Sequence, residues 1–157
     1  MNLWIAVGTR TVSDVVPAPP ADVRAFYLDL DNIKAVHPLV VAVETISRSE
    51  SADGYVQTYR VRDRIPLGPL TLPISYTATL TVPVAGDVLA DSVQFPQVRL
   101  HTVVSFIAVD DGTEVTERMQ ISAPRPLFGT TVSQAVAAHR KMLAGIRDRF
   151  ADASPSL

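Results

Sequence analysis

Residues 128–150, FGTTVSQAVAAHRKMLAGIRDRF, form the longest stretch of the chain in which apolar residues recur at helical spacing. At about 100° per residue, eight apolar side chains of this stretch lie within roughly 60° of the direction of His139. They are Phe128, Val132, Ala135, Val136, Met142, Leu143, Ile146 and Phe150. A titratable imidazole therefore occupies the centre of the apolar face of the longest predicted helix. The pattern leaves three interpretations of His139, as a core residue, a ligand-binding residue or a catalyst.

The composition describes one globular domain without cysteine chemistry. Hydrophobic residues make up 47% of the 157 residues and charged residues 19%, which is enough apolar material for a sizeable core. The absence of cysteine excludes disulfides, thiol nucleophiles and cysteine-ligated metals. The net charge is −2 and the arginines are scattered along the sequence. Net charge therefore gives no reason to expect nucleic acid or an anionic membrane as a partner.

The sequence predicts neither a signal peptide nor an integral membrane segment. MNLWIAVGTR, at residues 1–10, has a short apolar run without a preceding positive residue or a small-residue cleavage site. No apolar run reaches the roughly 20 residues that a membrane-spanning helix needs. We therefore expect a soluble cytoplasmic protein of bacterial type, with one domain over residues 1–152 and a flexible tail over residues 153–157.

The first part of the chain predicts one strand followed by two short helices. Leu3–Val16 is rich in valine, isoleucine and threonine, which is typical of a strand. Asp22 is placed to cap, or to charge the first turn of, a helix that continues to about Leu30. Asn32 is placed to cap a second helix, which ends before His37-Pro38 because proline disfavours helix in the preceding residue.

From Leu39 onward the sequence predicts six strands and then the long helix. The predicted strands cover residues 39–48, 55–65, 71–84, 88–95, 98–109 and 113–122. Asp110-Asp111-Gly112 is a hairpin signal, and the prolines and glycine of residues 66–69 predict a break. Strands joined by short turns are antiparallel, so the predicted class is α+β. We expect a curved antiparallel sheet of about seven strands wrapped around the C-terminal helix.

The order of elements and two stretches of sequence resemble a known superfamily. VPAPPADVRAFYLDLDNIKAVHPLV at residues 16–40 and GTEVTERMQISAPRPLFG at residues 112–129 are similar to the START/Bet v1-like (SRPBCC) superfamily of helix-grip proteins. This superfamily includes polyketide cyclase/dehydrase-like and lipid-transport proteins. The resemblance extends from about Thr11 to Phe150. It implies a largely apolar cavity between the sheet and the last helix, with the short helices near its mouth.

Glu117 is the second polar residue that the pattern directs into the core. Its neighbours at two-residue spacing, Val115, Met119 and Ile121, are apolar, so the carboxylate shares their inward phase. A buried carboxylate must find a partner or become neutral. Most strand arginines have the opposite phase, which makes His139 the interesting partner. Such a pair is either an acid/base dyad or a buried structural link, and the sequence leaves both open.

Other polar residues complete the predicted site. Tyr59, Asp63 and Tyr76 share the inward phase of their strands, where they either orient the oxygen atoms of a ligand or meet polar partners at the rim. By the resemblance, His37 lies near the cavity mouth, and the alternative is a surface histidine at a helix end. The candidate ligand-binding residues are Tyr59, Asp63, Tyr76, Glu117, Met119, Val132, Ala135, Val136, His139, Met142, Leu143 and His37.

Several kinds of site lack support in the sequence. The three histidines are far apart and show no HxH or HExxH spacing, and His101 is expected to be exposed, so no metal site is predicted. No glycine-rich loop leads from a strand into a helix, and no GxSxG elbow occurs. We expect no cofactor and no nucleic acid.

Three functions remain after these exclusions. The favoured one is binding of a hydrophobic small molecule, lipid or polyketide-like, between the sheet and the last helix. The alternative is an enzyme of the polyketide cyclase/aromatase or dehydratase type, with His139 and Glu117 as candidate catalytic residues for proton transfer. A protein-interaction module fits less well, because the outward residues Ser75, Thr77 and Thr79 have the polarity of a solvated face. The sequence does not determine the oligomeric state.

Overall fold

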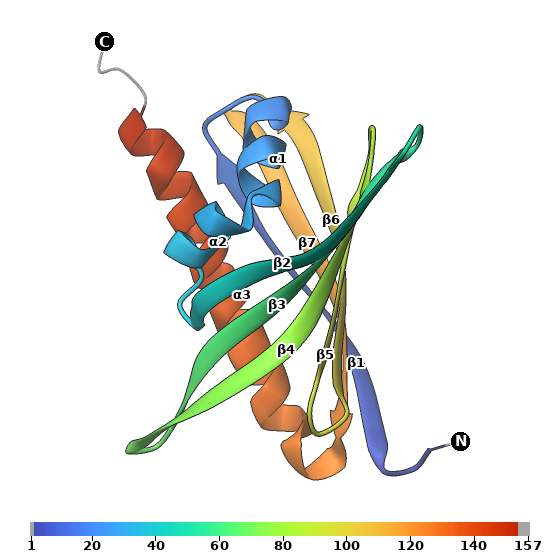
Figure 1. Cartoon of the computed structure of the whole chain (residues 1–157). Helices are drawn as coiled ribbons and strands as arrows, with labels where there is room; N and C mark the ends of the chain where they lie inside the picture. Colours follow the sequence, from blue (N-terminus) through green and yellow to red (C-terminus); the bar gives the residue numbers. More distant parts are fainter. Residues whose placement is uncertain (1, 154–157) are drawn as a thin grey trace.

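A seven-stranded antiparallel sheet curves around one long helix in the computed structural model, which describes residues 2–153 (Figure 1). The elements are β1 (Ile5–Val16), α1 (Pro20–Leu28), α2 (Leu30–Val36), β2 (Val40–Ser51), β3 (Gly54–Leu67), β4 (Leu70–Pro83), β5 (Val88–Gln94), β6 (Val98–Val109), β7 (Gly112–Pro124) and α3 (Arg125–Ala153). The predicted α+β class and helix-grip fold are confirmed. No helix within the described range is both long enough and apolar enough to cross a membrane.

The strand order places the first and second strands at opposite edges of the sheet. Hairpins join the strands from β2 to β7 in sequence, and β1 pairs with β7, which gives the order β1-β7-β6-β5-β4-β3-β2. The chain therefore has to pass from one edge to the other between β1 and β2. Helices α1 and α2 occupy this connection, and they lie beside α3 at one end of the sheet (Figure 1).

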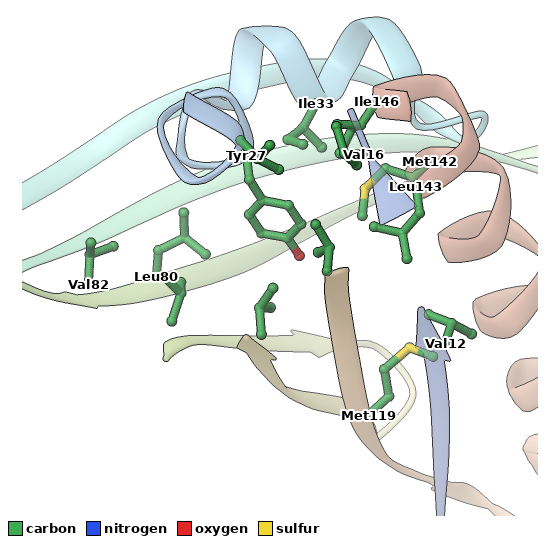
Figure 2. Close-up of a cluster of buried hydrophobic side chains, with 14 of the residues drawn as sticks. Val12, Val16, Tyr27, Ile33, Leu80, Val82, Met119, Met142, Leu143 and Ile146 are labelled. Carbon is green, nitrogen blue, oxygen red and sulfur yellow. The ribbon is translucent and has the colours of Figure 1, made fainter. Parts of the chain in front are cut away.

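The core lies between the inward face of the sheet and the apolar face of α3. Met119 on β7 is fully buried, and Leu143 and Ile146 on α3 are at most 1% exposed. Figure 2 shows these side chains together with Val12 of β1 and Tyr27 of α1. Each buried side chain of this size contributes about 1.5–3 kcal/mol. The inward phase predicted for β7 is confirmed, because its alternate residues are buried.

Two glycines allow close approach to α3. A Cβ atom at Gly8 of β1 would lie 2.9 Å from the ring of Phe128, and one at Gly145 would lie 3.0 Å from the Val36 side chain. Both distances are shorter than ordinary van der Waals contacts, so any larger residue would push its neighbour away. The contact at Gly145 holds the end of α2 against α3. It thereby brings His37, the next residue after α2, to the middle of α3.

The boundary between the two short helices differs from the prediction. The Asp29 carboxylate caps α2 by accepting a hydrogen bond from the Asp31 N–H group at 3.0 Å. The prediction that Asn32 caps the second helix is wrong. Asn32 lies inside α2, and its side-chain amide donates to the Phe26 carbonyl oxygen at 3.3 Å. Asp22 lies in the first turn of α1 without a side-chain cap hydrogen bond.

Three other boundaries also differ. Strand β3 continues through Pro66, which pairs with Thr71 where β3 and β4 form a two-stranded ribbon beyond the rest of the sheet. Proline is tolerated there because no third strand needs its missing N–H group. Helix α3 begins at Arg125, ahead of the predicted start near Phe128. It continues to Ala153, and the remaining predicted tail, residues 154–157, lies outside the described part of the chain.

Replacing Asp29 by alanine should lower the free energy of unfolding by about 1 kcal/mol, because α2 loses its side-chain cap. Urea denaturation measures this loss. Asp31→Ala is the matched control, since Asp31 also lies in the first turn of α2 but contributes only its backbone to the cap. Asp31→Ala should lower the free energy of unfolding clearly less than Asp29→Ala does. Equal losses for the two variants would contradict the assignment of Asp29 as the cap.

Candidate functional site

The Glu117 carboxylate and the His139 imidazole meet in the core. Glu117 on β7 is fully buried, the His139 side chain on α3 is 14% exposed, and Glu117 Oε2 is hydrogen-bonded to His139 Nδ1. Burial alone lowers the pKa of His139, but the charge and hydrogen bond of Glu117, with a further contribution from Asp63, outweigh burial and raise it above its ordinary value. The neighbouring carboxylates therefore favour the imidazolium form of His139. Its Nε2 remains the nitrogen available to a bound molecule.

The second oxygen of Glu117 is buried without a hydrogen-bond partner among the described residues. Tyr27 of α1 reaches into the core (Figure 2). Its hydroxyl interacts with the Glu117 carboxylate. Burial is the largest cause that raises the pKa of Tyr27 well above its ordinary value. The negative charge of Glu117 and its polar interaction with the Tyr27 hydroxyl raise the pKa further. The two groups interact, although their geometry falls short of a normal hydrogen bond. Tyr27 thus keeps its proton and is a hydroxyl donor beside the Glu117–His139 pair.

His37 packs against the ring of His139. The ring centroids are 5.5 Å apart and the ring planes cross at 85°. The backbone N–H of Leu39 donates to His37 Nδ1 at 3.2 Å, which places the proton of the neutral ring on Nε2. Burial, followed by the charge of His139, lowers the pKa of His37 to about 3. His37 is therefore a neutral N–H donor at the cavity wall, and the alternative of a surface histidine does not hold.

Asp63 of β3 and Tyr76 of β4 form a second polar pair. The Tyr76 hydroxyl donates to Asp63 Oδ1 at 3.3 Å. Burial raises the pKa of Asp63 to about 6, although the hydrogen bond from Tyr76 and the charge of His139 both oppose this rise. Burial, and then the charge of Asp63, raise the pKa of Tyr76 above its ordinary value. Asp63 consequently changes charge just below neutral pH, where an ordinary carboxylate is already ionised.

These polar groups lie where two hollows of about 120 Å³ each adjoin. The first hollow lies between the two short helices and the sheet, and its walls are mainly apolar, for example Ile33, Leu80 and Met142. The second lies between the first half of α3 and strands β3 to β6. Both hollows are bounded by His37, Tyr76, Ser92, Leu100 and His139. The first hollow is therefore mainly apolar, the second has mixed walls, and polar groups gather where the two adjoin.

Half of the predicted ligand-binding residues line these hollows, namely Asp63, Tyr76, Ala135, His139, Met142 and His37. Glu117 lies one step behind, in contact with His139. The other predicted residues on α3 and β7 pack in the core beside the hollows, namely Met119, Val132, Val136 and Leu143. The involvement of all these residues in ligand binding stays a prediction.

Tyr59 faces a different part of the molecule. It borders a polar depression of about 370 Å³ between the short helices and the β2–β3 hairpin, together with Asp29, Arg48 and Gln57. Arg48 stacks over the Tyr55 ring at 3.8 Å and hydrogen-bonds to Gln57 at 3.2 Å. The inward phase of Tyr59 is correct, since its side chain is 5% exposed. The structure separates it from the Glu117–His139 pair.

The remaining histidine is remote from the site. His101 lies on β6 opposite Asp91 of β5, and its Nδ1 is 2.6 Å from Asp91 Oδ1, with both side chains about half exposed. The expected exposure of His101 is confirmed. Within residues 2–153, no three histidine, aspartate or glutamate side chains are grouped closely enough to hold a metal ion.

Among the wall residues that the sequence analysis missed are two buried residues with a hydroxyl group, Tyr27 and Thr102. Tyr27 lies on the same side of the first predicted helix as Val23, Phe26 and Leu30. Its hydroxyl is the signal that this apolar side includes a polar group. Thr102 is 2% exposed and lies between Leu100 and Val104 on the apolar phase of β6, which was the available signal for it. Neither signal says that the residue faces a hollow, because that depends on where the helices cross the sheet.

Comparison with known proteins agrees with this architecture. Residues 9–152 match the family model described as polyketide cyclase/dehydrase and lipid transport. The chain belongs to this family. The match confirms the superfamily resemblance that the sequence stretches at residues 16–40 and 112–129 indicated. No curated protein sequence matches the chain significantly.

Solved structures share the fold of this family member at low sequence identity. TTHA0849 from Thermus thermophilus is 19% identical with a TM-score of 0.72, over 94% of this chain and 100% of that chain. The Zhui aromatase/cyclase from Streptomyces sp. R1128 is 13% identical with a TM-score of 0.70, over 92% and 93%. The di-domain ARO/CYC BexL from the BE-7585A biosynthetic pathway is 18% identical with a TM-score of 0.72, over 95% and 51%.

Replacing His139 by alanine should lower the free energy of unfolding by about 3–5 kcal/mol, because the Glu117 carboxylate is left buried without a partner. The double variant His139→Ala/Glu117→Gln removes that charge and should be more stable than His139→Ala alone. Urea denaturation of the wild type, both single variants and the double variant at pH 7 measures the coupling. Simply additive losses would show that the two side chains are not a coupled pair.

Proposed function

We propose that the protein binds a compact, largely apolar molecule that carries a carbonyl or hydroxyl oxygen. The observation that carries this proposal is the polar junction, where His37, Asp63, Tyr76 and His139 gather between a mainly apolar hollow and a second hollow of mixed polarity. Apolar walls with a few converging polar groups are the usual design of a small-molecule site. Membership of a family described by polyketide cyclases and lipid transport supports the same interpretation.

The size of the hollows favours a ring-shaped ligand over a long acyl chain. Each hollow measures about 120 Å³, whereas sites for drug-sized ligands typically measure about 300–1,000 Å³. The two adjoining hollows together accommodate one or two fused rings without large rearrangement. A folded, polyketide-like molecule therefore fits better than an extended lipid.

The polar junction supplies donors for an oxygen atom of the ligand. His37 presents Nε2–H in its neutral form, because its Nδ1 accepts the Leu39 N–H group. His139 presents Nε2–H when it is protonated, because its Nδ1 is bound to Glu117. A carbonyl, enol or phenol oxygen accepts hydrogen bonds from both types of donor. The ligand oxygen therefore belongs at the junction and its apolar rings belong in the hollows.

Ala78→Leu should abolish ligand binding, because the larger side chain fills the first hollow, which Ala78 lines. The wild type should bind 2-naphthol about tenfold more tightly than naphthalene, as expected from one added hydrogen bond of about 1–1.5 kcal/mol. Isothermal titration calorimetry with both molecules measures this preference. Ala137→Leu, at an exposed position on α3, is the control and should bind normally. Unchanged binding by Ala78→Leu, or no binding by the wild type, would contradict the proposal.

A second function, proton transfer at a carbon next to a carbonyl group, is favoured by the position of Asp63 and His139 on the same hollow. Above pH 6 or so, Asp63 is ionised and serves as a general base. It takes the proton from the carbon, the electrons of that C–H bond form the enol double bond, and His139 donates a hydrogen bond from Nε2 to the carbonyl oxygen. Enolisation precedes both ring closure and loss of water in a polyketone chain.

This second function predicts that the protein catalyses deuterium exchange at C1 of 2-tetralone in D₂O. NMR measures the rate of this exchange. The rate should rise with pH through about 6 as Asp63 ionises, and fall at higher pH as His139, whose pKa is raised, loses its proton. Asp63→Asn should lower the catalysed rate by about 10²–10⁴. Glu114→Gln removes an exposed carboxylate and is the control. Exchange no faster than in buffer would refute catalysis without affecting the binding proposal.

A further inference from the structure

The two ends of the sheet differ in charge. The β2–β3, β4–β5 and β6–β7 turns lie at one end (Figure 1), and they carry or adjoin Glu50, Asp53, Asp87, Asp110 and Asp111. The β3–β4 hairpin, the β5–β6 turn and the starts of β1 and α3 lie at the opposite end. Segments 2–9, 64–75, 92–100 and 122–134 build this second end, and they contain Arg64, Arg99 and Arg125 but no aspartate or glutamate. The turns at the first end are therefore mainly acidic, although Arg48 pairs with Glu50 there, whereas the charged residues of the second end are all basic.

The basic end also exposes large apolar side chains. Leu3 is 71% exposed, Trp4 56%, Leu70 71% and Phe95 89%. Trp4, Phe95 and Leu127 surround a shallow depression of about 390 Å³ together with prolines 96, 124 and 126. One exposed apolar side chain needs no explanation, but several at one end of the molecule indicate an interaction site. Core packing does not explain them, because they point away from the core.

The second hollow reaches toward the same end. Its walls include Ile65 in the β3–β4 ribbon, Gln94 and Val98 on either side of the β5–β6 turn, and Thr131 in the second turn of α3. These residues belong to the same segments that carry the arginines and the exposed apolar side chains. A molecule held at this end would therefore have a shorter path to the polar junction than a molecule held at the acidic end.

We propose that this basic, apolar end docks on a membrane surface that contains anionic lipids. Arg64, Arg99 and Arg125 meet the lipid phosphates, which attract basic side chains near the surface. Trp4 and Phe95 enter the headgroup layer, where aromatic side chains are favoured. The apolar side chains stand on separate turns instead of forming one groove, and a deformable lipid layer fits that contour better than a folded acidic protein. Docking does not depend on which molecule the hollows bind.

Vesicle binding tests the proposal, with Trp4 as the probe because the chain contains a single tryptophan. Vesicles of phosphatidylcholine and phosphatidylglycerol in a 3:1 ratio should shift the Trp4 emission to shorter wavelength and should sediment with the protein. Vesicles of phosphatidylcholine alone should bind at least tenfold more weakly. Added sodium chloride should weaken binding to the anionic vesicles, because it screens the arginines. Absence of binding to anionic vesicles would overturn the proposal.

Matched variants locate the surface. Phe95→Ser and Arg99→Glu should each weaken binding at least fivefold. Val84→Ser changes a 72% exposed residue at the opposite end, and Arg149→Glu makes the same charge change near the end of α3, so both should bind like the wild type. Circular dichroism should show that all four variants are folded. Equal losses in the control variants, or binding to soluble polyglutamate without binding to vesicles, would overturn membrane docking at this surface.

Discussion

The structure depends on burying the Glu117 carboxylate between β7 and α3. A buried charge without a partner costs several kcal/mol, so the sheet and the helix must meet with His139 opposite Glu117. This requirement fixes both the rotation of α3 about its axis and its position along β7. Apolar contacts alone tolerate a shift by one helical turn more easily than this ion pair does. The pair therefore selects one packing arrangement from several that would bury a similar apolar area.

The hollows follow from that arrangement. Helix α3 packs along β1 and β7, whereas it makes few or no contacts with strands β3 to β5. The short helices cover part of the exposed concave face, and the Gly145–Val36 contact fixes where they lie. Small side chains on the curved strands, such as Ala78 and Ala90, leave space between these layers. His139, which is paired with Glu117 and helps to hold the helix in place, thus also lines the space that the helix does not fill.

The sequence predicts what is local and misses what depends on long-range geometry. Alternation identified Asp63 and Glu117 as inward residues, because side-chain direction in a strand follows from spacing alone. Alternation did not distinguish Asp63 from Tyr59, because both side chains have the inward phase. Only Asp63 reaches the hollows, since α2 and the twist of the sheet divide the interior. The cap was misassigned because Asp29 and Asn32 are both good capping residues. Packing of the two helices, which the sequence does not show, decides between them.

The charge separation between the two ends is also a consequence of topology. In an antiparallel sheet, successive turns alternate between the two ends, so residues far apart in sequence gather at one end if they belong to alternate turns. The acidic turns here are the alternate ones, and Arg64, Arg99 and Arg125 lie at the other end. The net charge of the chain does not show this separation of charge, whereas the strand order does. The basic end is also the end toward which the second hollow extends, so the fold places exposed arginines beside one of its internal hollows.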